Sequence, residues 1–248
     1  MSLAVRTAAC LQDLGEQAAA TVLARLRVSP RPVLGVATGS SPLPLYQALA
    51  HRRADLPPLR AFALDEYLGL PAGHPQSYRE VVRREVTEPL GLDPAEVFVP
   101  EGGTDDPDRA AAAYEDAIRA AGGIDVQVLG IGSNGHLAFN EPGSPLDSRT
   151  RVVDLDASTR QANARFFASP EEVPYRALTQ GLGTILEAKA LVLMAAGESK
   201  AEAVERALYG PVTPELTASV LQLHPDVTVL LAEGANSLLP RAAEANLR

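Results

Sequence analysis

The sequence predicts an α/β fold, in which a doubly wound, mostly parallel sheet is flanked by helices in the manner of a modified Rossmann fold. Three observations support this prediction. Apolar runs of strand length recur along the chain, stretches with the 3.6-residue period of a helix separate them, and small or polar residues follow each run. Such alternation is typical of parallel sheets with right-handed crossovers.

Strands are expected where apolarity is nearly continuous, because a strand covered by helices on both faces has no solvent side. The runs that meet this condition are 32–37, 59–64, 125–131, 190–195 and 226–231. The helical period is clearest over 11–26, 78–86 and 201–208.

The region 142–174 is the least regular part of the chain, since it mixes Gly, Pro, Ser and charged residues. We expect it to form a flap, or lid, over the active site. No repeat and no convincing linker interrupts the chain, so we expect one domain over 1–248.

Composition and charge exclude several classes of protein. With 46% apolar and 21% charged residues the chain has enough apolar surface to fold. The formal net charge of −9 repels phosphodiester backbones, and no block of Lys and Arg offsets it, so we expect no nucleic-acid partner. A small anionic substrate is compatible with this charge, because a local basic pair outweighs a screened global field.

The N-terminal residues and the cysteine content bear on the compartment. Cys10 is the sole cysteine, which excludes an intrachain disulfide and a zinc knuckle. Polar residues from Gln12 onward interrupt any signal-peptide pattern, and the longest apolar run, 190–196, is far shorter than the roughly 20 residues of a membrane span. We expect a cytoplasmic protein with no membrane partner.

Ligands of doubly wound sheets bind beyond the carboxyl ends of the strands, so the loops after the apolar runs are candidate sites. The first such loop contains Thr38-Gly39-Ser40-Ser41-Pro42 and leads into a helix. Gly39 permits a tight turn, and serine hydroxyls beside unpaired amides are typical of a phosphate cradle. An ordinary helix N-cap explains these residues equally well. A P-loop is excluded, because no lysine follows the glycine.

Asp65 and Glu66 follow the second run. A carboxylate pair at this point can place one member in the cleft while the other faces away or bonds the backbone. We favour Asp65 for proton abstraction, because it is the first residue past the run. For either residue, a structural cap of the next turn is the competing interpretation, and the residues alone favour that cap.

The loop after the third run contains Gly130, Gly132 and Gly135, which match the dinucleotide fingerprint G-x-G-x-x-G. Asp154 or Asp156 lies at about the spacing of a ribose carboxylate. The sequence Asn-Glu-Pro-Gly-Ser-Pro that follows would break the crossover helix which the fingerprint needs, so we expect no nicotinamide cofactor.

His136 lies directly after this glycine turn, and Glu141 follows five residues later. The arrangement is typical of an acid/base histidine with an orienting carboxylate. A structural histidine with satisfied ring nitrogens is the alternative. The chain lacks the His-Glu-x-x-His spacing, so we expect no metal. The run 105–108 lacks the other calcium-loop positions and is interpreted as a helix entry.

Four longer segments, taken together, carry a resemblance. They are Gly35-Val-Ala-Thr-Gly-Ser-Ser-Pro42, Phe62-Ala-Leu-Asp-Glu-Tyr-Leu-Gly-Leu70, Gly130-Ile-Gly-Ser-Asn-Gly-His-Leu-Ala-Phe-Asn-Glu-Pro142 and Leu221-Gln-Leu-His-Pro225. In this order and spacing the chain resembles the glucosamine-6-phosphate deaminase family, also called the glucosamine/galactosamine-6-phosphate isomerases. Shorter matches extend the resemblance over nearly the whole chain. They are 74–78, 148–151, 163–167 and 197–200.

The resemblance implies an enzyme, a hydrolase acting on an amino sugar phosphate, that converts glucosamine 6-phosphate and water to fructose 6-phosphate and ammonium without a cofactor. By matching motif positions, His136 opens the pyranose ring with the help of Glu141 and Asn134. Asp65 then moves the C2 proton to C1 through an enolamine, and water attacks the resulting C2 iminium.

The same resemblance implies where the phosphate binds. The loop residues Gly39, Ser40 and Ser41 would hold it, with Arg165 and Lys200 as counter-charges. The alternative for the two basic residues is that they lie on a solvated helix face. Only the resemblance favours phosphate binding over this alternative.

The sequence departs from the family pattern at two points. Some relatives have aspartate at the position of Asn134, and because an amide carries no proton relay we expect it to orient its neighbours. Allosteric relatives bind N-acetylglucosamine 6-phosphate between subunits. Arg151 and Ser144 match their pattern, whereas Val153-Asp154 replaces a Lys-Thr pair and the chain ends at Arg248 without their longer extension, so we expect no allosteric activation.

Three alternatives stay open. A 6-phosphogluconolactonase shares the fold and a Gly-x-Asp-Gly-His loop, although Asn134 and the residues 139–142 fit a deaminase better. Galactosamine 6-phosphate is an alternative substrate, because contacts to the C4 hydroxyl are not readable. A sugar-phosphate-sensing regulator is the third alternative, although it usually carries a DNA-binding segment. The expected partner is thus a sugar phosphate, and the protein is either a monomer or a homo-oligomer.

Overall fold

A parallel seven-stranded sheet forms the centre of the computed structural model, which describes residues 2–240. The strand order is β1-β10-β9-β6-β2-β3-β5, and every neighbouring pair is parallel. The strands are β1 (Ser2–Thr7), β2 (Val33–Val36), β3 (Arg60–Ala63), β5 (Val97–Phe98), β6 (Val126–Leu129), β9 (Leu191–Ala196) and β10 (Asp226–Ala232). The predicted doubly wound sheet is confirmed.

Each of the five expected strands is present, whereas the two edge strands were not expected. β1 pairs with β10 alone and contains Ser2, Arg6 and Thr7 among its apolar residues. An edge strand has less buried surface than a central one, so its sequence carries a weaker apolar signal. β5 is two residues long and gives no periodicity to detect.

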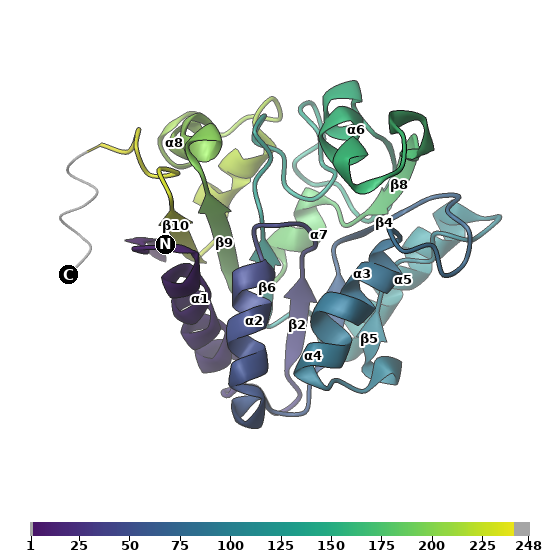
Figure 1. The fold of residues 1–248 in the computed structure, drawn as a ribbon, viewed down its shortest axis with the longest axis horizontal. Helices are drawn as coiled ribbons and strands as arrows, with labels where there is room; N and C mark the ends of the chain where they lie inside the picture. Colours follow the sequence, from purple (N-terminus) through teal and green to yellow (C-terminus); the bar gives the residue numbers. More distant parts are fainter. Residues whose placement is uncertain (1, 241–248) are drawn as a thin grey trace.

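Helices lie on both faces of this sheet (Figure 1). The helices of the described residues are α1 (Leu11–Leu26), α2 (Leu43–His51), α3 (Tyr78–Val82), α4 (Glu88–Leu90), α5 (Pro107–Ala121), α6 (Ala157–Asn163), α7 (Leu182–Leu186) and α8 (Ala201–Tyr209). A π-helical turn over Arg83–Thr87 joins α3 to α4. The expected helix entry at 105–108 is confirmed, because Asp106 caps α5 by accepting the N–H of Arg109.

A second, three-stranded antiparallel sheet has the order β4-β8-β7. Its strands are β4 (Asp65–Tyr67), β7 (Arg151–Asp154) and β8 (Arg176–Thr179). The chain passes from the large sheet to the small one at Leu64, so Asp65 begins a new strand rather than a loop. The region 142–174 is more regular than its composition indicated, since β7 and α6 both lie in it.

The two sheets have separate apolar clusters. Aliphatic side chains from β2, β6, β9 and β10 pack with α1, α2 and α8 into the main core. A smaller cluster of Tyr67, Phe139, Leu155 and Ala177 packs beside the small sheet. The ring of Tyr67 lies 5.6 Å from that of Phe139, within the range of favourable aromatic pairs.

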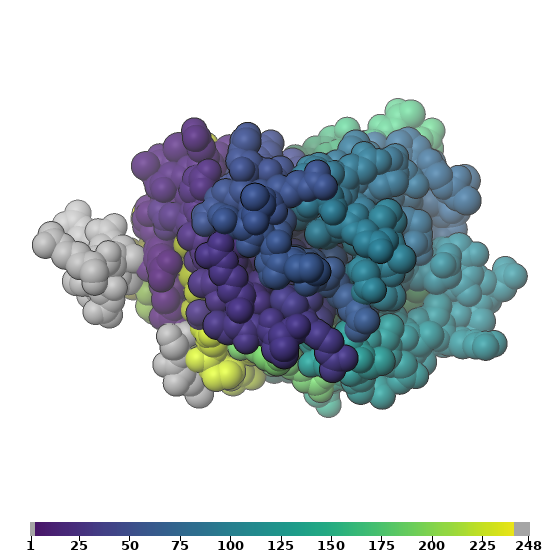
Figure 2. All heavy atoms as spheres, turned by 90° about the horizontal axis from the view of Figure 1, so that it is seen from below, coloured from purple at the N-terminus to yellow at the C-terminus, as the bar shows by residue number. Residues whose placement is uncertain are grey.

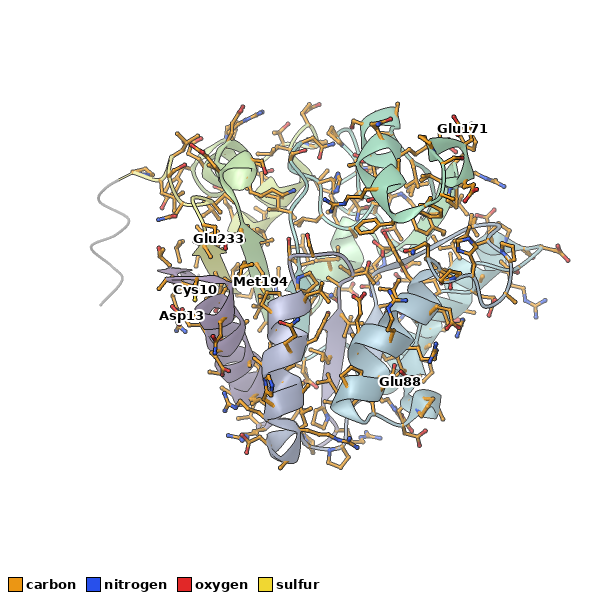
Figure 3. All side chains as sticks on the ribbon, viewed as in Figure 1. Cys10, Asp13, Glu88, Glu171, Met194 and Glu233 are labelled. Carbon is orange, nitrogen blue, oxygen red and sulfur yellow. The ribbon has the colours of Figure 1, made fainter. Side chains whose placement is uncertain are left out.

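The two ends of the large sheet are covered differently. α6 lies beyond the carboxyl ends of the strands, while the opposite end is formed mainly by the first half of the chain (Figures 1 and 2). Figure 3 places Glu171, in the 3₁₀-turn Pro170–Glu172, on the outer side of the candidate flap, away from the sheet.

Candidate active site

A cleft of about 600 Å³ lies at the carboxyl ends of the strands. It is lined by eight of the nine residues that the sequence singled out, namely Gly39, Ser40, Ser41, Asp65, Asn134, His136, Arg165 and Lys200. The ninth, Glu141, lies behind His136 and bonds to it. The structure therefore brings together residues from the loops after β2 and β6, from the strand β4, from the turn before α8 and from the candidate flap.

The loop after β2 lines one end of this cleft. Gly39 has φ +93°, a left-handed value that favours glycine, and no atom lies within 4 Å of the place its Cβ would take. The N-cap of α2 is Pro42, and no side chain caps that helix. The N-cap interpretation of Ser40 and Ser41 is therefore wrong, and both residues instead line the cleft.

Two basic side chains, Arg165 and Lys200, also line this cleft. Arg165 lies in the 3₁₀-turn η4 (Ala164–Phe166) and Lys200 ends the 3₁₀-turn η6 (Glu198–Lys200), just before α8. Burial and the nearby positive charge of Arg165 lower the pKa of Lys200. Within residues 2–240 neither forms an ion pair with a carboxylate. Two such cations are well suited to bind an anion.

The structure gives the adjacent carboxylates Asp65 and Glu66 different tasks. Glu66 accepts backbone N–H groups of Tyr67, Tyr78 and Arg79, each at 2.8 Å, and so holds the start of α3. Asp65 is 6% exposed and lines the cleft. Burial, and secondarily the charge of Glu66, raise the pKa of Asp65 well above its ordinary value. A buried carboxylate with a raised pKa is suited to take up a proton.

His136 belongs to a hydrogen-bonded cluster with Asn134, Glu141 and Thr159. Its Nδ1 lies 3.2 Å from Glu141 Oε2, which also accepts the amide of Asn134 at 3.0 Å. The Oδ1 atom of Asn134 accepts the backbone N–H of His136 at 3.2 Å. The hydroxyl of Thr159 donates to Glu141 Oε1. The orienting role predicted for Asn134 and Glu141 agrees with these contacts.

The charge of Glu141 fixes the tautomer of His136. Burial alone would raise the pKa of Glu141, but the hydrogen bonds from His136, Thr159 and Asn134 outweigh it and lower that pKa. An ionised carboxylate can only accept hydrogen bonds, so Nδ1 of the imidazole carries the proton. The Nε2 atom of a neutral imidazole is then free to accept one.

Two glycines of the G-x-G-x-x-G pattern pack closely against neighbouring side chains, and one of these side chains is His136. A Cβ on Gly132 would lie 2.6 Å from the imidazole Nε2, so the ring packs directly on that glycine backbone. Gly135 has φ +85°, and its Cβ would lie 2.1 Å from Leu216. Asp156, which had the spacing of a ribose carboxylate, caps α6 by accepting the N–H of Ser158. These contacts give Gly132, Gly135 and Asp156 structural roles in the loop and in α6.

Arg151 and Ser144, which match the allosteric pattern, bond to each other, and Arg151 also bonds to the loop after β6. The guanidinium of Arg151 donates to Ser144 Oγ at 3.1 Å and to Asn140 Oδ1 at 2.8 Å. Asn140 is buried and also donates to the carbonyl of Gln180 at 2.8 Å. Arg151 therefore ties the start of the candidate flap to the loop that carries Glu141.

Four further polar residues at the site, Thr159, Asn163, Tyr67 and Tyr78, were not predicted as functional. Thr159 contacts Glu141, and Asn163 donates its amide to the hydroxyl of Tyr67 at 3.0 Å. The hydroxyl of Tyr78 lies 3.4 Å from the same oxygen. Asn163 and Tyr78 lie in segments that carry the family resemblance, which could have indicated them. Thr159 has no such signal, because its partner lies 18 residues away on another loop.

The structure also bears on metals and membranes. Across residues 2–240 no group of three or more His, Cys, Asp and Glu side chains is placed to hold a metal ion. No helix in this described part of the chain is both long and apolar enough to cross a membrane.

Comparison with known proteins identifies the family of this chain. Residues 6–230 match the family described as glucosamine-6-phosphate isomerases/6-phosphogluconolactonase. A glucosamine-6-phosphate deaminase of Arthrobacter sp. (strain FB24) is 53% identical over 92% of this chain and 89% of its own length. The glucosamine-6-phosphate deaminase of Cutibacterium acnes is also 53% identical, over 93% of this chain and 90% of its own.

Solved structures agree with this relationship. A monomeric glucosamine-6-phosphate deaminase superposes with a TM-score of 0.90 at 40% identity, covering 95% of this chain and 99% of that one. The 6-phosphogluconolactonase of Trypanosoma brucei has a TM-score of 0.77 at 20% identity, covering 96% and 99%, and so shares the fold. The chain therefore belongs to the family of glucosamine-6-phosphate isomerases and 6-phosphogluconolactonases.

Proposed function

We propose that the protein is a glucosamine-6-phosphate deaminase, which converts glucosamine 6-phosphate and water to fructose 6-phosphate and ammonium. One observation carries the proposal: Asp65 and the His136–Glu141 pair line or adjoin one cleft that also contains two basic residues, which form no ion pair with any carboxylate of residues 2–240. The names of the relatives at about half identity support the same substrate.

The substrate phosphate binds at the loop Gly39–Ser41, with Arg165 and Lys200 as counter-charges. Backbone amides at a tight glycine turn and two cations provide the donors that a phosphate needs. Because the protein carries a formal net charge of −9, this local pair is what attracts an anionic sugar.

Ring opening is the task of His136. Its Nδ1–H is held by Glu141, so the second nitrogen, once protonated, gives a proton to the ring oxygen as the bond from C1 to that oxygen breaks. The C1 hydroxyl loses its proton to water in this step, and the C1 carbonyl forms. Glu141 stabilises the imidazolium that forms before this transfer, and Asn134 holds Glu141 in place. A positioned acid/base group of this kind accelerates a reaction by about 10² to 10⁴.

Isomerisation is the task of Asp65. Its carboxylate takes the proton from C2 of the open-chain sugar, so that C1=C2 forms and the C1 oxygen gains a proton from water, which gives the enolamine. Asp65 then returns its proton to C1, and the C2 iminium forms. Water then adds to the C2 iminium, and ammonia leaves to give the ketone. The burial that raises the pKa of Asp65 makes it a stronger base toward carbon than an exposed carboxylate.

The reaction class expected from the sequence is corrected in one respect. A hydrolase was expected, whereas the matching family is described by the name of isomerases and the relatives are named deaminases. Water enters this reaction after a hydrogen has moved between two carbons. The activity is therefore described as an isomerising deamination.

The region 142–174 acts as the lid in this proposal, and the chain acts as a single domain. Thr159, Asn163 and Arg165 of this region face the cleft or its catalytic residues. Every proposed site residue comes from one chain, so a monomer is sufficient for activity, and a homo-oligomer would repeat the site. Sedimentation of the active enzyme distinguishes the two states.

The test is a panel of three substrates given to the purified protein: glucosamine 6-phosphate, galactosamine 6-phosphate and 6-phosphogluconolactone. Ammonium and fructose 6-phosphate are expected in equal amounts from the first. Ammonium from galactosamine 6-phosphate alone would assign the other epimer. Lactone hydrolysis without any ammonium release would refute the proposal in favour of the lactonase.

A further inference from the structure

The helix α6 and the turn η4 place three polar side chains toward the site within seven residues. Thr159 and Asn163 are four positions apart in α6, so they share one face of the helix. Arg165 follows two residues later in η4 and lines the cleft. This short segment therefore reaches the phosphate end of the cleft and both halves of the catalytic machinery.

Thr159 acts on the histidine side. It is 6% exposed, and its hydroxyl donates to Glu141 Oε1 while the other oxygen, Oε2, accepts Nδ1 of His136. Each oxygen of the Glu141 carboxylate thus accepts a hydrogen bond from a different side chain, and these two bonds fix the rotation of the carboxylate plane. Without Thr159 that plane could turn, and the imidazole would lose its fixed orientation.

Asn163 acts on the Asp65 side. Its amide donates to the hydroxyl of Tyr67 at 3.0 Å, and Tyr67 lies two residues after Asp65 in the strand β4. The ring of Tyr67 is buried against Phe139 and Tyr78. A bond from α6 to this ring therefore fixes α6 relative to the strand that carries the base.

We propose that Thr159 and Asn163 are positioning residues, through which α6 couples phosphate binding at Arg165 to the orientation of Glu141 and of the strand that carries Asp65. The coupling needs no new contact to the sugar, because α6 carries Thr159 and Asn163 and continues directly into the turn η4, which carries Arg165. The phosphate coupling rests on the proposed function, whereas the contact between Thr159 and Glu141 does not.

The first test compares Thr159→Val with Thr159→Ser. Valine keeps the shape and loses the donor, so kcat should fall about 10- to 100-fold, the range of one hydrogen bond to a charged group. Serine keeps the hydroxyl and should restore most of kcat. KM should change little, because Thr159 does not belong to the phosphate site. Gln161→Val is the matched control, since Gln161 is exposed on the same helix.

A double-mutant cycle separates positioning from general damage to the helix. In a Glu141→Gln background, Thr159→Val should cost little further activity, because the residue acts through that carboxylate. An equal loss in both backgrounds, or no rescue by serine, would overturn the proposal for Thr159.

A second cycle tests Asn163. The variants Asn163→Leu and Tyr67→Phe should each lower kcat, and the double variant should have a kcat no lower than that of the more affected single variant. Additive losses would overturn this part.

A measurement without substrate keeps this inference separate from the proposed function. The proton on His136 Nδ1 should give a downfield NMR signal while it is donated to Glu141. That signal should weaken or shift in Thr159→Val and persist in Thr159→Ser and Gln161→Val. An unchanged signal in Thr159→Val would overturn the role of Thr159 even if ammonium is produced. If the wild-type protein produces no ammonium, the proposed function fails while this result still decides the positioning role.

Discussion

Individual residues in this site have environments that stability alone would not favour. Asp65 is the clearest case, because burial and, secondarily, the charge of Glu66 raise the pKa of its carboxyl group. Ala138, another residue of the cleft, has φ +52°, a left-handed value that is uncommon outside glycine. Such features concentrate at functional sites, where the surrounding structure enforces them.

Asp65→Asn should therefore remove activity and raise stability at neutral pH. The folded-state pKa of Asp65 lies above its unfolded value, so ionisation disfavours the folded state. This loss of stability begins as the pH rises past the unfolded pKa of about 4 and is complete above the folded pKa. Urea titrations at several pH values should show equal stabilities below pH ~4 and a more stable variant at pH ~7. A variant that is less stable at neutral pH would contradict the assigned environment.

Gly132→Ala should damage catalysis more than folding. A Cβ at this position would lie 2.6 Å from Nε2 of His136, so the imidazole must move by a substantial fraction of an ångström. Displacements of about 1 Å in an active site cost about 10² in rate. Gly103→Ala is the control, because its Cβ would have its nearest neighbour at 3.5 Å. Equal kcat values for both variants would exclude the close packing of the ring on Gly132.

A buried carboxylate, that of Glu115, joins the helices α5 and α7 to the segment just before β7 of the small sheet. Glu115 of α5 is 5% exposed and accepts bonds from Thr150, just before β7, and from Thr184 of α7. Arg149 also donates to it at 2.6 Å. Burial by itself would raise the pKa of Glu115, but these hydrogen bonds outweigh it and the pKa is lowered. Glu115 thus anchors Arg149 and Thr150, which lie in the candidate flap, to α5.

Glu115→Gln should destabilise the protein by about 1–3 kcal/mol at pH ~7, because an amide cannot accept all these donors. The wild-type contribution is present above the unfolded pKa of about 4.3, since the folded pKa lies below that value. It is lost as the pH falls through the folded pKa. Thermal melts should therefore show a difference between wild type and variant that shrinks in acid. A constant difference across pH would contradict an ionised Glu115.

At the scale of elements, the sequence predicted what depends on local pattern. The five central strands are nearly all apolar, and α1 has a clear apolar face, so both were visible in the sequence. The small sheet was not, because β4 pairs Asp65 with Thr179, more than a hundred positions away, and its strands are three or four residues long. Local periodicity carries no information about such pairing.

The same reasoning explains which parts of the site were predictable. Loops after parallel strands converge by topology, so Ser41, Asp65 and His136 could be placed at one edge of the sheet. Thr159 and Asn163 act from a helix whose position depends on the small sheet. Their roles became visible once that sheet and its neighbours were known.

The whole molecule divides the proposed chemistry between its two sheets. The loops that follow strands of the large sheet contain His136 and the proposed phosphate-binding residues Gly39–Ser41, while Asp65 is the first residue of a strand in the small sheet. The active geometry therefore depends on how the small sheet is held against the large one. Leu64, at the junction, donates its N–H to Val36 of β2 and accepts that of Gln180 after β8, which fixes this relation.

The most direct measurement follows the hydrogen that Asp65 is proposed to move. Glucosamine 6-phosphate labelled with deuterium at C2 is turned over in ordinary water, and the fructose 6-phosphate formed is examined by NMR. We expect part of the deuterium at C1 of the product from the wild-type protein, because a buried carboxylate exchanges slowly with solvent, and no product from Asp65→Asn. Labelled product formed at the wild-type rate by Asp65→Asn would contradict the central role of this residue.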